Sequence, residues 1–287
     1  MSARRLAQTV SLLLLLRGLS DAETLTFDFA SGDFNWTAGF ADYPSDADPD
    51  FYELQSGFRS RPDNLGVGGS IFISGSNHSD DLFMFIKKSV PALAPNTLYS
   101  VTFRVALASK YAVGSGGIGG SPADSVYLKA GASRFEPDRV VDGDGWYRMN
   151  LDKGNQANEG SGALILGTIG KPDDGTANYA LIERTNTGRP LNVWTSASGE
   201  LWLIVGTDSG FEGTTSLYYT KIIAELEVTN PLRIAREEQM IKLEWTAGVL
   251  QRAASPLGEW ADLPGAMSPL RENVTTEARK FWRVRSN

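Results

Sequence analysis

The chain contains no cysteine and only one histidine, His78, among its 287 residues. The lack of cysteine excludes disulfides, thiolate metal sites and a cysteine nucleophile. A single histidine excludes a metal centre built from several histidines of one chain. If the protein is exported, its stability must therefore come from a large core or a bound ion rather than from cross-links.

Long apolar runs are also scarce, and the one near the start is short. Arg4 and Arg5 precede the apolar run Leu12–Leu16, and small residues follow it. This order is typical of a secretory signal peptide, so we expect residues 1–22 to be removed and the protein to be secreted or held at the cell surface, in a periplasmic or extracellular location. A membrane anchor is the alternative, but the run is too short to span a bilayer and Arg17 interrupts it.

Positive charge is in deficit. The chain has 27 Lys and Arg against 34 Asp and Glu, a net charge of −7. Removal of residues 1–22 takes away three arginines and one aspartate and leaves −9. An acidic surface disfavours nucleic acid and anionic membranes as partners. After the first 22 residues, no segment has the length and apolarity of a transmembrane helix.

Helical periodicity is nearly absent, and apolar and polar residues alternate with a period of two instead. The alternation runs through residues 99–107 and 217–228. In the second segment, Tyr218, Ile222 and Leu226 are expected to share one face of a strand. Such alternation predicts strands with one face in contact with water.

Three short runs are apolar at every position: Leu82–Ile86, Leu164–Leu166 and Leu201–Val205. They predict central strands that are buried on both faces. About ten strands separated by Gly, Asp, Asn and Pro clusters predict an all-β fold, an antiparallel β-sandwich of jelly-roll type, over residues 23–230. A parallel α/β fold is disfavoured because no helical segment lies between the strands.

Residues 231–287 predict a second, small β module. Ile241, Leu243 and Trp245 alternate with polar residues, and Pro264–Gly265 marks a turn. About 55 residues are few for independent folding without disulfides. We therefore expect the module to pack on the first domain or on a partner.

Five long motifs stand out between residues 24 and 228. They are GFADYP (39–44), NHSDDLFMF (77–85), GIGGSPADSVYLKAG (117–131), LDKGNQ (151–156) and ELWLIVGTDSGFEGTTSLYY (200–219). These motifs resemble a family of secreted or lipoprotein bacterial proteins that has no established activity. The resemblance implies export and a β-rich domain and assigns no catalytic residue. This chain lacks the signal cysteine of the lipoprotein members, which excludes a thiol-linked lipid anchor.

The tail has a motif of its own, W-x-x-G-x-L-Q…G-x-W…P-G…F-x-R-V. It is carried by Trp245, Leu250, Gln251, Trp260, Phe281 and Val284. This pattern resembles a short C-terminal β module that is appended to many exported proteins of environmental bacteria. The resemblance implies a role at the surface or in sorting.

The segment Gly199–Gly213 joins a predicted strand to a loop that carries Asp208 and Glu212 between glycines. Two carboxylates on one loop can bind Ca²⁺, or can divide acid and base roles in glycoside cleavage. The alternative is a solvated turn in which Asp208 caps its own backbone. Catalytic pairs usually come from separate strands, so the sequence favours the turn first, ion or sugar binding second and catalysis last.

The polar segment 77–81 contains the only imidazole of the chain, so any histidine base must be His78. Asp80 or Asp81 would orient it. A nucleophilic triad also needs a serine, and no G-x-S-x-G elbow occurs. A polar turn is therefore the favoured interpretation, and His78, Asp208 and Glu212 are the catalytic candidates.

The candidate metal ligands lie in the acidic segment 42–50. Asp46 and Asp48 have the alternate spacing by which calcium loops direct carboxylates at one ion, although the EF-hand pattern fails. A disulfide-free exported sandwich would gain stability from a structural ion. Ca²⁺ is therefore a candidate cofactor, with Asp46, Asp48 and Asp50 as its candidate ligands.

A last group combines aromatic rings, amides and carboxylates near predicted loops. Flat rings stack on sugars, and amide groups hydrogen-bond their hydroxyls, although a ring is more often part of the core. The candidate ligand-binding residues are Tyr43, Trp146, Asn155, Gln156, Asp208, Phe211 and Glu212.

These observations predict an exported, non-catalytic protein that binds extracellular carbohydrate, with calcium as an aid. One alternative is a polysaccharide-active enzyme, a hydrolase or lyase. Another is a structural protein whose tail docks to a cell-surface component. If His78, Asp208 and the loop 152–156 meet in a concave site, ligand binding or catalysis is favoured, and if they disperse, ordinary turns explain them.

Overall fold

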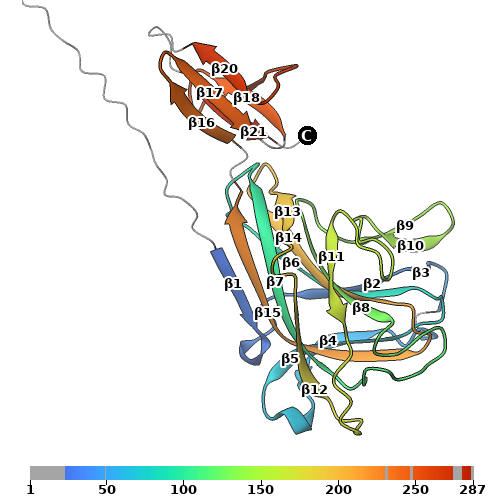
Figure 1. Ribbon diagram of the computed structural model, residues 1–287. Helices are drawn as coiled ribbons and strands as arrows, with labels where there is room; N and C mark the ends of the chain where they lie inside the picture. Colours follow the sequence, from blue (N-terminus) through green and yellow to red (C-terminus); the bar gives the residue numbers. More distant parts are fainter. Residues whose placement is uncertain (1–22, 49, 230–231, 246–247, 274–279, 286–287) are drawn as a thin grey trace, which may run out of the picture.

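The computed structural model describes residues 23–287 except 49, 230–231, 246–247, 274–279 and 286–287. The predicted signal peptide, residues 1–22, lies outside the described residues. The described part is all-β, with antiparallel pairing between its strands and two single-turn 3₁₀ helices, η1 (Phe29–Ser31) and η2 (Asp63–Leu65) (Figure 1). In that part, neither helix has the length and apolarity needed to cross a membrane.

The larger sheet is built around two long neighbouring strands, β7 and β15. β15 pairs with β7 along one side, and with β5 and then β1 along the other. The order of the sheet is β12 (Ala180–Thr185), β7 (Leu98–Ser109), β15 (Thr214–Val228), β5 (Gly69–Ser76) and β4 (Gln55–Ser60), with β1 (Glu23–Asp28) also on β15 and β13 (Leu191–Trp194) also on β7.

The second sheet has five strands. Its order is β11 (Ala163–Thr168), β8 (Val126–Ser133), β14 (Leu201–Ser209), β6 (Leu82–Val90) and β2 (Thr37–Ala41). The runs Leu82–Ile86 and Leu201–Val205 lie in central strands, as predicted. The run Leu164–Leu166 lies in β11 at the edge, so that prediction was wrong. Of this run only Leu166 is buried, because an edge strand has a neighbour on one side alone.

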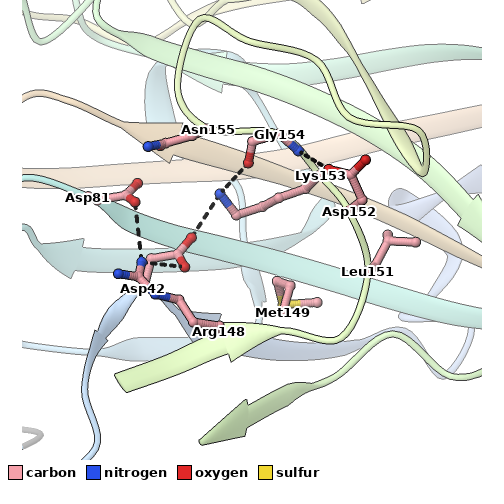
Figure 2. A pocket seen from close by; sticks show the side chains of 9 residues that line it. All are labelled: Asp42, Asp81, Arg148, Met149, Leu151, Asp152, Lys153, Gly154 and Asn155. Atoms are coloured by element: carbon pink, nitrogen blue, oxygen red, sulfur yellow. Dashed lines mark hydrogen bonds and ion pairs between the residues drawn. The ribbon is translucent and has the colours of Figure 1, made fainter. Parts of the chain in front are cut away.

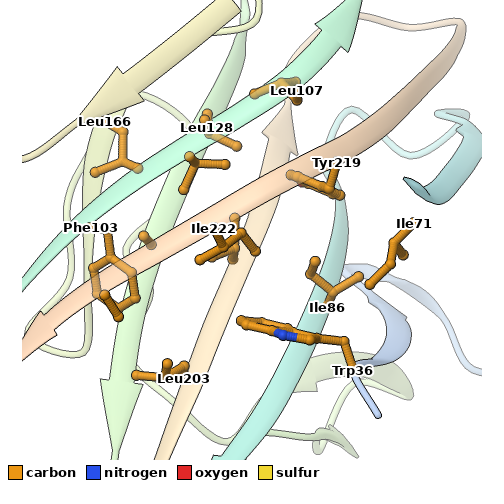
Figure 3. Close-up of a cluster of buried hydrophobic side chains, with 14 of the residues drawn as sticks. Trp36, Ile71, Ile86, Phe103, Leu107, Leu128, Leu166, Leu203, Tyr219 and Ile222 are labelled. Carbon is orange, nitrogen blue, oxygen red and sulfur yellow. The ribbon is translucent and has the colours of Figure 1, made fainter. Parts of the chain in front are cut away.

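The two sheets pack face to face, and their inward-facing side chains form the main core (Figure 3). Phe103 and Ile222 of the larger sheet meet Leu128 and Leu203 of the smaller one, and Trp36 closes the same layer. All of these side chains are less than a tenth exposed. The predicted sandwich is thus held by a core large enough to stand without disulfides.

A β-bulge in β15 reverses which side chains face the core. The pairing register with β7 shifts between Tyr219 and Lys221, so that Thr220 is the extra residue. Before the bulge Tyr219 is buried, and after it Ile222 is buried. Tyr218 instead lies on the outer face against the ring of Phe72. The expectation that Tyr218 and Ile222 share a face was therefore wrong, because a strict period of two fails across a bulge.

The outer face of the five-stranded sheet is covered as well. Phe83 and Phe85 project from this face with parallel rings 5.5 Å apart, and Met149 and Leu151 pack over them. Gly39 lies beneath Phe85, where a Cβ atom would come within 2.4 Å of the ring. The covering segment follows a small three-stranded sheet of β3 (Tyr43–Pro44), β10 (Trp146–Met149) and β9 (Arg139–Val141).

The C-terminal module consists of two three-stranded sheets around a small core of Leu243, Leu250 and Val284. Trp194 of β13 packs against this core, so the module rests on the end of the sandwich (Figure 1). The sheets are β16 (Leu232–Glu237), β17 (Met240–Trp245) and β20 (Leu270–Asn273), and β19 (Ala261–Asp262), β18 (Val249–Ala253) and β21 (Phe281–Arg285).

Candidate functional site

A network of buried charges lies on the covered face of the five-stranded sheet, and Asp208 is at its centre. Oδ2 of Asp208 accepts hydrogen bonds from Nζ of Lys129 at 2.8 Å, Nζ of Lys153 at 2.8 Å and the backbone N–H of Gln156 at 2.9 Å. Nζ of Lys129 also donates hydrogen bonds to the backbone carbonyls of Lys153 and Asn158. The covering loop is thus bonded to the sheet through two buried ammonium groups.

The network continues to the small sheet through Arg148. Its Nη1 lies 3.0 Å from Oδ1 of Asp42 and 3.4 Å from Oδ2 of Asp81, and its Nε lies 3.5 Å from Asp142. Oδ2 of Asp42 lies 2.8 Å from Nζ of Lys153. Each buried carboxylate therefore faces at least one cation, which is the condition under which charges tolerate burial.

Two buried carboxylate oxygen atoms of this network lack a hydrogen-bond donor. They are Oδ1 of Asp81 and Oδ1 of Asp208, and neither accepts a hydrogen bond from the described residues. Burial, together with the charges of Asp208 and Asp42, raises the pKa of Asp81 to about 8. Burial also acts on Asp208, but the ammonium groups of Lys153 and Lys129 outweigh it and lower its pKa. At neutral pH Asp81 therefore carries a proton, whereas Asp208 is ionised.

The same three carboxylates are the described residues that come nearest to a metal site. Oxygen atoms of Asp42, Asp81 and Asp208 lie within 4.8 Å of one another, and an all-oxygen donor set suits Ca²⁺. The ammonium group of Lys153, however, already lies 2.8 Å from both Asp42 and Asp208, and Lys129 is bonded to Asp208 as well. A divalent ion there would be placed against two cations, so these residues do not fit calcium.

The acidic loop that suggested calcium does not gather its carboxylates. Asp46, Asp48 and Asp50 are all exposed. Oδ1 of Asp48 accepts the backbone N–H of Asp50 at 3.0 Å, which makes an Asx turn. These three residues form no close ligand set in the described part of the chain. The loop is a capped turn, and the spacing of its aspartates reflects that turn.

Beside the charge network, the surface opens into a cavity of about 280 Å³. Figure 2 shows Asp42, Asp81 and Arg148 toward one end of the cavity, and Leu151 and Asp152 at the other. We call this cavity the Arg148 pocket, and its walls are Asp42, Asp81, Arg148, Met149, Leu151, Asp152, Lys153, Gly154 and Asn155.

The loop 152–156 is held rigidly beside this pocket. The carboxylate of Asp152 accepts hydrogen bonds from the backbone N–H of Gly154 and from both N–H and Oγ of Ser161. These bonds lower the pKa of Asp152. Gly154 has φ +70° and lies so close to Asn158 that a Cβ atom would come within 2.1 Å of its carbonyl oxygen. Only glycine fits there, and the turn directs Lys153 inward and Asn155 outward.

Asn155 and Gln156, both expected to bind ligand, have different surroundings. Asn155 is exposed and lines the pocket, and within the described residues its side-chain amide makes no hydrogen bond. The side-chain amide of Gln156 donates to the carbonyl of Asp80 at 2.8 Å. Asn155 is thus available to a ligand, whereas Gln156 joins two loops of the protein.

Asp208 is not on a turn. It belongs to β14, its side chain is completely buried, and it pairs in register with Tyr127 of β8 and Phe83 of β6. The glycine-flanked turn begins only after Ser209. The strand therefore extends farther into the polar segment than the sequence suggested, because Lys129 and Lys153 offset the charge of Asp208.

Two aromatic candidates belong to the protein's own packing. Tyr43 is buried, packs against Tyr52 and Tyr147, and does not line the Arg148 pocket. Trp146 is half-buried, with the guanidinium of Arg148 4.8 Å from its ring centroid. Its ring orients Arg148 and does not line the pocket.

The remaining candidates lie at the neighbouring loops. His78 is exposed and stacks on Phe51, with ring centroids 4.1 Å apart. The pKa of Glu212 is raised, chiefly because the carboxyl group of Asp80 lies close by, and the nearby His78 opposes this shift only in part. Phe211 packs against the edge of the main core. His78 and Glu212 are therefore near each other, but neither lines the pocket, and Asp208 is sealed from solvent.

The cations that complete the site, Lys129, Lys153 and Arg148, were not among the residues predicted from the sequence. Lys129 stands between Leu128 and Ala130 on β8, and a lysine at an inward strand position is a sign of a buried partner. Lys153 lies between Asp152 and Gly154 in a polar loop, where no neighbour marks it as buried. Arg148 follows Trp146 at a spacing of two, which places both on one face of a strand. These positions indicate buried ion pairs only when the facing carboxylates are known.

No family model matches the chain, and no curated protein matches it. Among solved structures, the chain is similar to the carbohydrate-binding module TmCBM61 in complex with β-1,4-galactotriose, at 12% identity and a TM-score of 0.32 over 69% of this chain and 92% of that one. It is also similar to the family 11 carbohydrate-binding module from Clostridium thermocellum in complex with a β-1,3-1,4-mixed-linked tetrasaccharide (11% identity, TM-score 0.29, 74% and 96%). A third is the K1 cleaved adhesin domain of Lys-gingipain from Porphyromonas gingivalis (13% identity, TM-score 0.29, 72% and 98%). At such TM-scores the similarities say nothing about the ligand of this chain.

Proposed function

We propose that this protein is exported and binds extracellular carbohydrate without cleaving it, through the Arg148 pocket. The observation that carries the proposal is the pocket itself. It is open, about 280 Å³ in volume, and lined by several polar groups around the apolar side chains of Met149 and Leu151. A few fixed polar groups beside apolar surface are what a sugar ring requires.

The charges of the pocket favour an uncharged ligand. Arg148 is held between Asp42 and Asp81, and Lys153 is held between Asp42 and Asp208. A charged ligand would have to break these pairs or leave one of the charges unpaired, at a cost of several kcal/mol. A polyhydroxyl ligand can add hydrogen bonds at the edges of the paired groups.

The pocket is also formed before any ligand arrives. Its walls are fixed by buried ion pairs and by the glycine turn at Gly154. A rigid site loses little conformational entropy on binding, which suits ligands such as sugars that gain little from each contact. The side-chain amide of Asn155 is the adaptable group on this rim.

The decisive experiment is a glycan array with the mature protein, followed by calorimetric titration of the glycans retained. We expect Asn155→Ala to weaken binding by roughly fivefold, because one hydrogen bond to the ligand is worth about 1 kcal/mol. Asn178→Ala is the matched control, since Asn178 is exposed on another loop and its side-chain amide makes no hydrogen bond to other described residues. If no glycan is retained, or if both variants bind alike, the proposal fails.

Export is part of the same proposal. The signal-like segment 1–22 supports it. Intact mass measurement of the protein recovered from outside the cytoplasm of the producing cell tests it, and cleavage after Ala22 is the expected result. A chain that is recovered only inside the cell with all 22 residues would contradict it.

A further inference from the structure

A second and larger cavity lies where the sandwich meets the C-terminal module. Its volume is about 400 Å³, and its walls come from the end of β8, from β13 and from Gly248 of the module. We call it the Trp194 groove. The side chains that matter below are Phe135, Asn192 and Trp194.

The Trp194 groove and the Arg148 pocket are neighbours. Leu151 and Asp152 line both cavities. In Figure 2 these two residues stand at the end of the pocket that is farthest from Asp81. An elongated ligand that fills the pocket and continues past Leu151 therefore enters the groove.

Leu151 and Asp152 form the ridge between the two cavities, and an elongated ligand can cross it. The carboxylate of Asp152 already accepts three hydrogen bonds, from Gly154 and Ser161. These bonds stabilise the charge of Asp152, so a ligand that crosses it does not have to supply a hydrogen-bond donor. Leu151 beside it is buried, so the ridge does not shift with a flexible side chain.

The groove repeats the chemistry of the pocket with aromatic rings added. Phe135 is 46% exposed, a large fraction for an aromatic side chain. Trp194 is half-buried, with one part of its indole on the core of the C-terminal module. Asn192 is exposed on β13 and, within the described residues, its side-chain amide makes no hydrogen bond. Rings beside a free amide suit the apolar face and the hydroxyls of a second sugar.

We propose that the Trp194 groove is a second subsite of one extended binding site, and that the ligand is a linear, uncharged oligosaccharide long enough to occupy both cavities. This rests on the function proposed above and adds the class of ligand. The proposal also gives the C-terminal module a role in ligand binding, because Gly248 forms part of the wall of the groove.

Calorimetry with neutral linear gluco-, galacto- and xylo-oligosaccharides of one to six units tests the proposal. We expect affinity to rise with length until both cavities are filled. Phe135→Ala should weaken the longest ligands roughly three- to tenfold and leave the shortest unchanged, because one stacking contact is lost. Phe58→Ala is the matched control, since Phe58 is 49% exposed and lies on β4 of the other sheet.

The outcomes separate the two proposals. If the wild-type protein binds sugars with an affinity that does not depend on length, or if Phe135→Ala behaves like Phe58→Ala, the extended site is wrong while the function stands. If none of the oligosaccharides binds and the glycan array is also empty, the function itself is wrong and the subsite falls with it.

Discussion

Nζ of Lys129 lies 2.8 Å from Oδ2 of Asp208, and both side chains are almost completely excluded from solvent. The two residues stand on the neighbouring strands β8 and β14, where Lys129 is paired in register with Gly206. Strand pairing therefore creates the ion pair. It also means that neither charge can escape to water if its partner is removed.

We expect Lys129→Met to lower the free energy of unfolding by about 3–5 kcal/mol, because it leaves Asp208 with half of its cationic partners in a buried site. Lys221→Met is the control. Lys221 is 42% exposed and lies 3.7 Å from Asp28, so its loss should cost less than about 1 kcal/mol. Urea denaturation measures both, and equal effects would contradict the importance of the buried pair.

The raised pKa of Asp81 predicts a dependence of stability on pH. Because burial and the Asp208 and Asp42 charges raise the pKa of Asp81 to about 8, the folded chain keeps a proton that the unfolded chain releases near pH 4. The unfolded state binds fewer protons in this window, so the contribution of Asp81 to stability falls from about pH 4 to about pH 8.

The variant Asp81→Asn should remove that decline, since an amide stays uncharged at every pH. Urea midpoints of the two proteins should be similar near pH 5 and should separate toward pH 9, where the variant becomes the more stable. Arg148, Lys153, Asp42 and Asp208 face Asp81 and are unchanged in both proteins. Parallel curves would show that Asp81 is already ionised at neutral pH.

The hydroxyl of Tyr219 predicts a stabilising substitution. It is fully buried and has no hydrogen-bond partner among the described residues. We expect Tyr219→Phe to be neutral or to stabilise by about 1 kcal/mol, because an unsatisfied polar group is removed. The hydroxyl of Tyr111 donates to Thr214 and accepts from Ser216, so Tyr111→Phe should destabilise. Thermal melts that rank the two variants in the reverse order would contradict this.

Removal of divalent ions should leave the melting temperature unchanged. The carboxylates Asp42 and Asp208 are compensated by lysine ammonium groups at 2.8 Å, and the loop of Asp46 and Asp48 is a capped turn. Melts in the presence of EDTA and in millimolar CaCl₂ check this. A rise of several degrees with calcium would restore the calcium hypothesis and would require a ligand set that the present geometry lacks.

The sandwich could be predicted because strand patterns are local. Alternation at 99–107 and the continuous run Leu201–Val205 each report burial through residues that are close in sequence. The bulge at Thr220 escaped prediction because nothing in the sequence marks the point at which the pairing register changes. The edge position of β11 could not be predicted for a similar reason, because the order of strands in a sheet depends on pairing between segments far apart in the sequence.

Part of the site could be predicted from the sequence, and the rest could not because it depends on contacts between distant segments. The loop 152–156 and Asp208 do meet, as the ligand-binding hypothesis required, and Asn155 lines the pocket. His78 was singled out for its rarity, but the structure leaves it exposed on Phe51. The role of Lys129 depends on a carboxylate 79 positions away, and a single sequence gives no indication of such a pair.

The place of β15 in the larger sheet has a consequence for synthesis of the chain from its N-terminus. This strand lies between β7 and the pair of β5 and β1, although it is the last strand of the sandwich to be made. Until residues 214–228 have emerged, β1 has no neighbour and the two halves of the sheet have no strand to join them. The sandwich therefore closes in one late step, after that strand has been made.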